Sequence, residues 1–395
     1  MKALNDNAHP LESLLQQHCP NGVEFKELGE LELNKILNLG RGKIISQNDL
    51  KNCPGEYPVY SSSATKNGEI GKYGKYMFDD ERITWSIDGG GKFFYRNHLK
   101  YSVTNVCGWI KVINLDELNT KFLFYALINE WVKKKFNYTK KAHPSIIKKE
   151  YCIPLPPLEI QYKIVEILDA FTELEAELEA ELEARLKQYH YYRNKLLSHD
   201  ELENRTAKSR NDSDPTPLVP LVTLGEVCEV KRGVRVTKKD LTENEKYPVF
   251  QNSLTPMGYY NQSNVNANTP FIIVGGSAGE IGWSSSSYWA ADDCIYFICE
   301  KSLMNRFLYH ALCNQQHYFL SQVRKASIPR LSQDCIKKLK IPLPPLAVQN
   351  EIVELLDKFD TLTNDLTSGI PAEIEARKKQ YEYYRERLLS FIAKD

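Results

Sequence analysis

Side chains suited to binding a polyanion gather at predicted turns in two separate parts of the 395-residue chain. Arginine and lysine can bind phosphates or guanine edges, and asparagine or glutamine can pair with adenine. Each of these residues could instead be a solvated surface side chain. The candidates for contact with double-stranded DNA are Arg41, Lys43, Ser61, Ser62, Ser63 and Lys92 in the first part, and Arg232, Arg235, Gln251, Asn252, Ser253, Arg324 and Arg330 in the second.

The formal net charge of zero conceals an alternation of charge along the chain. Residues 1–152 carry a net charge of +5 and residues 201–340 carry +3. Residues 153–200 carry −5 and residues 341–395 carry −3. A polyanion would therefore bind the two basic stretches rather than the acidic ones.

Sequence motifs for catalysis are absent from the chain. An adenine methyltransferase needs an Asn/Asp-Pro-Pro-Phe/Tyr loop around the extruded base. Both Pro-Pro pairs here, at 156–157 and 344–345, lie between leucines. No Gly-x-x-x-x-Gly-Lys phosphate loop occurs, and the eight histidines show no metal-ligand spacing. The sequence therefore predicts a non-catalytic chain with no metal or cofactor of its own.

The cysteine count and the apolar runs indicate the cellular compartment. Nine cysteines without a Cys-x-x-Cys pair favour reduced thiols and a cytoplasmic protein. We expect Cys294 and Cys299 to be strand core rather than metal ligands. No run of about eighteen apolar residues and no basic-then-apolar leader occurs, so we expect neither a membrane span nor a secretory signal.

The elements that must position the candidate side chains occur twice. The run Ile-Pro-Leu-Pro-Pro-Leu stands at 153–158 and again at 341–346, and Lys-Gln-Tyr-x-Tyr-Tyr-Arg stands at 187–193 and 379–385. Strand-like and helix-like runs of the first block recur in the same order in the second. The predicted fold is α+β, with similar mixed α/β domains at 1–152 and 218–340, long helices at 153–198 and 341–395, and a polar linker at 199–217.

Both predicted long helices begin at a proline pair and carry an apolar stripe. The stripes are Ile160, Ile164, Ile167, Leu168 and Phe171 in the first helix, and Val348, Ile352, Leu355, Leu356 and Phe359 in the second. An isolated helix could not bury its stripe, so we expect an antiparallel coiled coil between the two copies and a pseudo-twofold chain. The tyrosines near the far ends are expected to pack in its seam.

The two helices differ in their middle parts. Glu-Leu-Glu-Ala occurs three times in tandem over 173–184, and its strong helix formers outweigh the repulsion between glutamates. One repeat adds about 6 Å of helix, so the segment suits a spacer of adjustable length. A solvated acidic helix is the alternative. The second helix is interrupted by Ser-Gly-Ile-Pro at 368–371, which should break or kink it.

Two similar blocks, each followed by Ile-Pro-Leu-Pro-Pro-Leu, a long helix and Lys-Gln-Tyr-x-Tyr-Tyr-Arg, resemble the specificity subunit of a type I restriction–modification system. The resemblance implies target recognition domains that each read one half of an asymmetric bipartite DNA site. It implies helices that set the spacing and dock two methyltransferase subunits. It also implies that S-adenosylmethionine, ATP and magnesium belong to partner subunits, including separate restriction and translocase subunits.

Two other interpretations compete with this resemblance. A coiled-coil scaffold with two protein-binding domains would have no sequence-specific DNA affinity. An enzyme with an unrecognised site would show activity as the purified chain alone.

Overall fold

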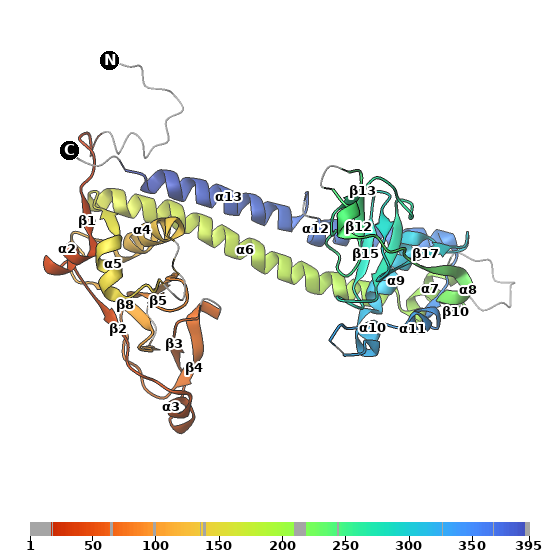
Figure 1. Cartoon of the computed structure of the whole chain (residues 1–395), viewed down its shortest axis with the longest axis horizontal. Helices are drawn as coiled ribbons and strands as arrows, with labels where there is room; N and C mark the ends of the chain where they lie inside the picture. Colours follow the sequence, from red (N-terminus) through yellow and green to blue (C-terminus); the bar gives the residue numbers. More distant parts are fainter. Residues whose placement is uncertain are drawn as a thin grey trace, which may run out of the picture. The chain divides into compact units, whose positions relative to one another are not determined.

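A computed structural model of the chain describes residues 17, 19–63, 66–97, 100–134, 136, 140–208, 219–242, 245–325, 327–365 and 367–391 (Figure 1). The chain divides into two compact units. Unit 1 consists of Met1–Glu177 and Ile374–Asp395, and unit 2 consists of Leu178–Glu373.

Unit 1 is built on three small sheets. Its central sheet has the antiparallel strand order β2-β8-β5-β6, a second sheet has the order β4-β3-β7, and β1 pairs with β9. The strands are β1 (Phe25–Glu27), β2 (Leu37–Arg41), β3 (Tyr57–Tyr60), β4 (Glu69–Tyr73), β5 (Arg82–Ser86), β6 (Phe93–Arg96), β7 (Ser102–Val103), β8 (Cys107–Val112) and β9 (Cys152–Pro154). The helices wholly within it are α2 (Leu28–Leu33), α3 (Gln47–Asn52), α4 (Thr120–Lys133) and α5 (Pro144–Glu150), and η1 (Lys66–Gly68) is a short 3-10 turn.

Unit 2 repeats this sheet topology strand by strand. Its sheets have the orders β11-β17-β14-β15 and β13-β12-β16, and β10 pairs with β18. The strands are β10 (Leu221–Thr223), β11 (Cys228–Arg232), β12 (Tyr247–Phe250), β13 (Tyr259–Tyr260), β14 (Thr269–Ile273), β15 (Ile281–Ser284), β16 (Trp289–Ala290), β17 (Cys294–Cys299) and β18 (Lys340–Pro342). The helices wholly within it are α7 (His199–Lys208), α8 (Leu224–Val227), α9 (Asn305–Asn314), α10 (Gln316–Gln322), α11 (Gln333–Lys337) and α12 (Leu346–Asn364), with the 3-10 turn η2 (Lys238–Asp240).

The long helices complete the cores of the units. Helix α6 (Leu158–Leu196) is continuous through the tandem repeat, and α13 (Ile370–Leu389) follows α12. In unit 1, Ile160 and Ile164 of α6 share one buried cluster with Leu388 of α13. In unit 2, Tyr189 of α6 shares a buried cluster with Ile352 of α12. The predicted apolar stripes are therefore core, and the helices are part of the two domains rather than separate from them.

The helices pair in the predicted antiparallel sense. In unit 1, Phe171 stacks on Tyr384 with ring centroids 5.2 Å apart, and Glu175 pairs with Lys378 at 3.4 Å. Going from Phe171 to Glu175 along α6, the partner on α13 moves back from Tyr384 to Lys378, so the two helices run in opposite directions. Helix α13 lies beside α6 in Figure 1. In unit 2, Tyr189 and Tyr192 both stack on Phe359. The tyrosines therefore pack in the seam, as predicted.

Two segments test the sequence-based boundaries. The predicted interruption of the second helix is confirmed, because α12 ends at Asn364 and α13 begins at Ile370. The linker predicted at 199–217 is helical over His199–Lys208, where Leu202 and Thr206 are buried on one side of α7. Their spacing of four residues is the helical signal that the polar composition concealed. Residues 209–217 lie outside the described residues.

One buried glutamine at the start of each long helix fixes the loop that leads into α4 or α9. Gln161 Nε2 donates to the Glu117 and Pro156 carbonyls, at 2.9 and 2.8 Å, and its Oε1 accepts from the Asn119 N–H at 2.8 Å. Gln349 makes the same three bonds to Ser302, Pro344 and Met304, each 2.8 Å. The repeated Pro-Leu-Pro-Pro-Leu-x-x-Gln sequence thus encodes a repeated joint between helix and domain.

Candidate functional site

Corresponding strand ends and loops converge in each unit, and we call this region the loop edge. In unit 1 it comprises residues 41–43, 61–63, 87–92, 104–106 and 140–142; in unit 2 it comprises 232–235, 251–253, 274–279, 291–293, 324–325 and 327–331. Matching backbone bonds hold it together. The Gly42 N–H donates to the Cys107 carbonyl at 3.1 Å, and the Gly233 N–H donates to the Cys294 carbonyl at 2.8 Å. Nearly all the predicted contact residues therefore lie on one comparable region of each unit.

Glycine is required where these segments cross. A Cβ on Gly42 would lie 2.0 Å from the Val103 oxygen, and one on Gly233 would lie 2.2 Å from the Ala291 oxygen. No side chain fits at such distances, so the glycines that follow Arg41 and Arg232 are a steric necessity. They place Arg41 and Arg232 at the exposed ends of β2 and β11.

In unit 1 the three serines tie the loop edge together. Ser61 Oγ lies 2.8 Å from Thr104 Oγ1. Ser62 Oγ accepts from the Asp88 N–H at 2.7 Å, and the Ser62 carbonyl accepts from Ser86 Oγ at 2.8 Å. Ser63, next along the same loop, is half-buried. Their hydroxyls thus support the loops as well as lining them.

The basic candidates of unit 1 occupy different positions. Arg41 and Lys43 are exposed after β2, where Lys43 bridges Thr104 through its backbone. Lys92 begins the turn into β6, and its ammonium lies 5.5 Å from the centroid of the Phe94 ring. Of the three, Arg41 and Lys43 are the most accessible to a polyanion.

In unit 2 the candidates meet at two adjacent carboxylates. Arg330 Nη1 lies 2.6 Å from Asp293 Oδ1, and Arg232 Nη2 lies 3.5 Å from the same oxygen. Gln251 Nε2 donates to Asp292 Oδ1 at 3.1 Å. The sequence analysis named the three basic and amide residues but missed both aspartates, which organise them.

The remaining candidates of unit 2 frame this cluster. Asn252 accepts from the Ser277 N–H through its carbonyl at 2.9 Å, and Ser253 Oγ donates to the Thr255 carbonyl at 3.0 Å. Arg324 exchanges both backbone hydrogen bonds with Arg330, at 2.9 and 3.2 Å. Arg235 is exposed in the segment between β11 and η2.

Unit 1 carries an ion pair that the sequence analysis also missed. Lys141 Nζ lies 3.1 Å from Asp88 Oδ1. Lys141 corresponds to Arg330, because the N–H of the following residue bonds to the matching carbonyl in each unit: Ala142 to Ile87, and Leu331 to Val274.

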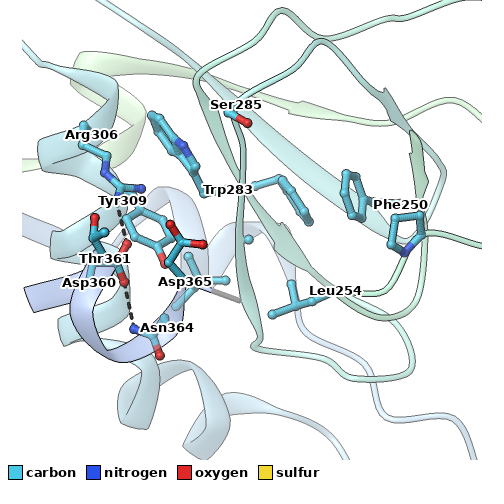
Figure 2. Close-up of a pocket in the computed structure, with 14 residues that line it drawn as sticks. Phe250, Leu254, Trp283, Ser285, Arg306, Tyr309, Asp360, Thr361, Asn364 and Asp365 are labelled. Atoms are coloured by element: carbon cyan, nitrogen blue, oxygen red, sulfur yellow. Dashed lines mark hydrogen bonds and ion pairs between the residues drawn. The ribbon is translucent and has the colours of Figure 1, made fainter. Parts of the chain in front are cut away.

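A cavity of unit 2 with a volume of about 560 Å³ lies beside α9 and the end of α12 (Figure 2). Phe250, Trp283 and Arg306 are among the residues that line it. Arg306 pairs with Asp357 at 2.7 Å and Asp360 at 2.6 Å, and its guanidinium lies 4.7 Å from the Trp283 ring centroid. These contacts join α9 to α12, so this wall of the cavity serves packing.

A titratable pair lies close to that wall. His310 is fully buried, and its Nε2 lies 2.7 Å from Asp357 Oδ1. Burial lowers the pKa of His310 below its usual value. Burial raises the pKa of Asp357, but the hydrogen bonds from His310 and Arg306 outweigh it and hold that pKa below its ordinary value. The folded unit therefore favours a neutral imidazole beside a charged carboxylate.

The described ranges were also searched for metal sites and membrane spans. Within them, no group of three or more His, Cys, Asp and Glu side chains is placed to hold a metal ion. No helix there has the length and apolar character needed to cross a membrane. Cys294 is fully buried in β17 and Cys299 lies at its end, as strand residues, as predicted.

Comparisons with known proteins agree with this twofold architecture. A family model described as the type I restriction modification DNA specificity domain matches the chain twice, at residues 20–188 and 219–376. A Mycoplasma pneumoniae protein described as a type I specificity subunit is 31% identical over 91% of this chain and 97% of its own length. A Haemophilus influenzae protein described as a type I restriction enzyme specificity subunit is 31% identical over 98% of this chain and 100% of its own length.

A solved structure shares the fold. The crystal structure of the S subunit of a type I restriction–modification system from M. genitalium matches with a TM-score of 0.63 at 19% identity, and the match covers 98% of each chain. The family model therefore matches the chain twice, just as the loop edge and the joint between helix and domain each occur twice in the structure. The chain belongs to the DNA specificity subunits of type I restriction–modification systems.

Proposed function

We propose that each unit reads one half of an asymmetric, split DNA site through its loop edge. The proposal rests on one observation above all. The same backbone bonds build both loop edges, whereas the side chains they present differ, as two related sites with different specificities require. The thirteen candidate residues and the four acidic and basic residues found beside them are the groups proposed to contact DNA or to orient those that do.

The same proposal assigns the chemistry to other subunits. The chain itself is non-catalytic and acts in the cytoplasm, where its helices dock two methyltransferase subunits. S-adenosylmethionine, ATP and magnesium are bound by the methyltransferase and by separate restriction and translocase subunits. Support comes from the membership of the family and from the absence of methyltransferase and phosphate-loop motifs in the sequence.

A methylation map tests the recognition role directly. The chain is co-expressed with its cognate methyltransferase subunit, and modified bases are located across a genome by single-molecule sequencing. We expect a split, asymmetric motif whose half-site centres lie about one helical turn, roughly 10 bp, apart. An assembled complex that was supplied with S-adenosylmethionine and gave no motif would favour the scaffold interpretation.

The tandem repeat in α6 provides a second test. Deleting one Glu-Leu-Glu-Ala unit, residues 177–180, shortens the helix by about 6 Å, which corresponds to roughly 2 bp. We expect the unspecified gap to shorten while both half-sites stay the same. The double variant Glu177→Gln/Glu179→Gln, which keeps the length, should leave the gap unchanged. Altered half-site sequences in the deletion variant would rule out a spacer role.

A further inference from the structure

Asp293 stands between two arginines in the loop edge of unit 2. Its Oδ1 lies 2.6 Å from Arg330 Nη1 and 3.5 Å from Arg232 Nη2. The carboxylate side chain is only 14% exposed, whereas the two arginine side chains are 50% and 52% exposed. A largely buried carboxylate therefore holds two half-exposed guanidiniums at one place on the surface.

The backbone fixes both arginines as well. Arg330 lies at the base of a hairpin, where its N–H and C=O both bond to Arg324, and the neighbouring Pro329 carbonyl accepts from the Gly276 N–H at 3.2 Å. Arg232 Nε donates to the Asp292 carbonyl at 2.6 Å. Both side chains thus lose little conformational freedom on binding a ligand, which raises affinity by preorganisation.

Glycine at position 275 makes this arrangement possible. A Cβ on Gly275 would lie 2.5 Å from the carboxyl carbon of Asp293. At the corresponding position in unit 1, Asp88 supplies the carboxylate and binds Lys141. The two units therefore carry the acid on different segments of the loop edge, 87–92 in unit 1 and 291–293 in unit 2. Among the ion pairs described, only Asp293 binds two arginines.

The charge of the cluster favours bases over phosphates. Arg232 and Arg330 are balanced by Asp292 and Asp293, so these four side chains together have no net charge with which to attract the DNA backbone. A guanidinium still offers a rigid fork of N–H donors, and guanine presents two acceptors, O6 and N7, in the major groove. Adenine places an N–H donor beside its N7 and cannot accept both bonds.

We propose that Asp293 is a positioning residue that aims Arg330 and Arg232 at guanine, so that the half-site of unit 2 contains guanine. This inference rests on the proposed function. It adds a base to one half-site and a residue that controls its recognition.

Methylation mapping of the complex with its methyltransferase subunit tests the inference. Variants Asp293→Asn and Arg330→Ala are compared with Asp88→Asn, the matched change in unit 1. We expect Asp293→Asn and Arg330→Ala to relax the motif at a guanine of one half-site, and Asp88→Asn to change only the other half-site. A wild-type complex without any split motif would overturn the recognition role itself.

Binding to duplexes that carry the mapped site provides the atomic test. Replacing the assigned guanine by 7-deazaguanine removes the N7 acceptor, and we expect wild-type affinity to fall by about 10-fold, within the range for one bidentate pair. Arg330→Ala should lose affinity for the natural site by a similar factor and then be insensitive to 7-deazaguanine. Thermal unfolding of each variant complex confirms that it is assembled.

Three outcomes would overturn the inference while leaving the recognition role intact. The half-site altered by Arg330→Ala could lack guanine. Asp293→Asn could weaken both half-sites equally. Folded Arg330→Ala could respond to 7-deazaguanine as strongly as the wild type does.

Discussion

The two loop edges use one backbone plan and opposite placements of charge. Unit 1 has Asp88 paired with Lys141, whereas unit 2 has Gly275 at the position of Asp88 and a carboxylate at Asp293 instead. Several backbone bonds near these residues recur in both units, among them Ala142 N–H to the Ile87 carbonyl and Leu331 N–H to the Val274 carbonyl. The comparison teaches that the framework depends on strand pairing and glycines, while the chemistry presented depends on a few side chains that can be exchanged.

The contact between each long helix and α4 or α9 likewise combines a shared framework with different side chains. In unit 1, Lys121 and Tyr125 both bond to Asp169, each at 2.6 Å. In unit 2, Arg306 and His310 both bond to Asp357, each at 2.7 Å, and Arg306 also reaches Asp360. In each unit, one aspartate on the long helix thus binds two side chains from α4 or α9, but the contact in unit 2 contains more charged groups.

The largest difference in stability between the units should appear when Arg306 or Lys121, the cation that binds the aspartate on the long helix, is replaced by alanine. Arg306→Ala leaves Asp360, which is 14% exposed, without its cation, and should destabilise unit 2 by about 3 kcal/mol. Lys121→Ala breaks a more exposed pair and should cost unit 1 about 1 kcal/mol. Urea-dependent hydrogen exchange of peptides from α9 and α4 measures each unit separately. Equal losses would show that the extra aspartate adds nothing.

The two buried glutamines, by contrast, should contribute equally to the stability of their units. Gln161→Ala and Gln349→Ala each remove three hydrogen bonds from a fully buried position. Each should destabilise its own unit by about 2 kcal/mol, because buried carbonyl and N–H groups lose their partners. The same hydrogen-exchange measurement applies. A difference of more than about 1 kcal/mol between the units would contradict the equivalence of the two joints.

The smallest expected effect is on the pH dependence of stability. The pKa of His310 is lower in the folded chain than its unfolded value of about 6.5, so the unfolded state binds more protons below that pH. Unit 2 should therefore keep its full stability above about pH 6.5 and lose up to about 1.4 kcal/mol per pH unit below it. Tyr125 occupies this place in unit 1 and remains neutral over that range, since burial raises its pKa.

Hydrogen exchange at pH 7.0 and 5.5, corrected for intrinsic rates, measures this effect. His310→Gln should remove most of the pH dependence of unit 2 while leaving that of unit 1 unchanged. Unchanged pH dependence in the variant would assign the effect to other groups.

Much of this arrangement could be predicted from the sequence because it is local or periodic. The apolar stripe that includes Ile164 and Phe171 predicted the core of α6 and its antiparallel partner. The repeated Ile-Pro-Leu-Pro-Pro-Leu runs predicted two corresponding helix starts. Helix α7 was missed because its buried positions, Leu202 and Thr206, are only two residues in a polar segment.

The cluster around Asp293 could not be predicted from spacing. Asp293 follows the short strand β16, Arg232 ends β11, and Arg330 lies in a hairpin far along the chain. Both arginines were identified as candidates because they lie at predicted turns, but no sequence pattern near them linked them to an aspartate. The steric role of Gly275 depends on that same contact and was equally invisible.

The sequence by itself determined the twofold plan, the long helices, their pairing and the family, because these depend on repeats and on periods of 3.6 and 2 residues. Only the tertiary structure decided which acid meets which base. An ion pair needs two side chains within about 4 Å, and here the partners are separated by tens of residues and joined by long-range strand pairing. In the proposed function, specificity depends on such contacts, so it is decided by the tertiary structure.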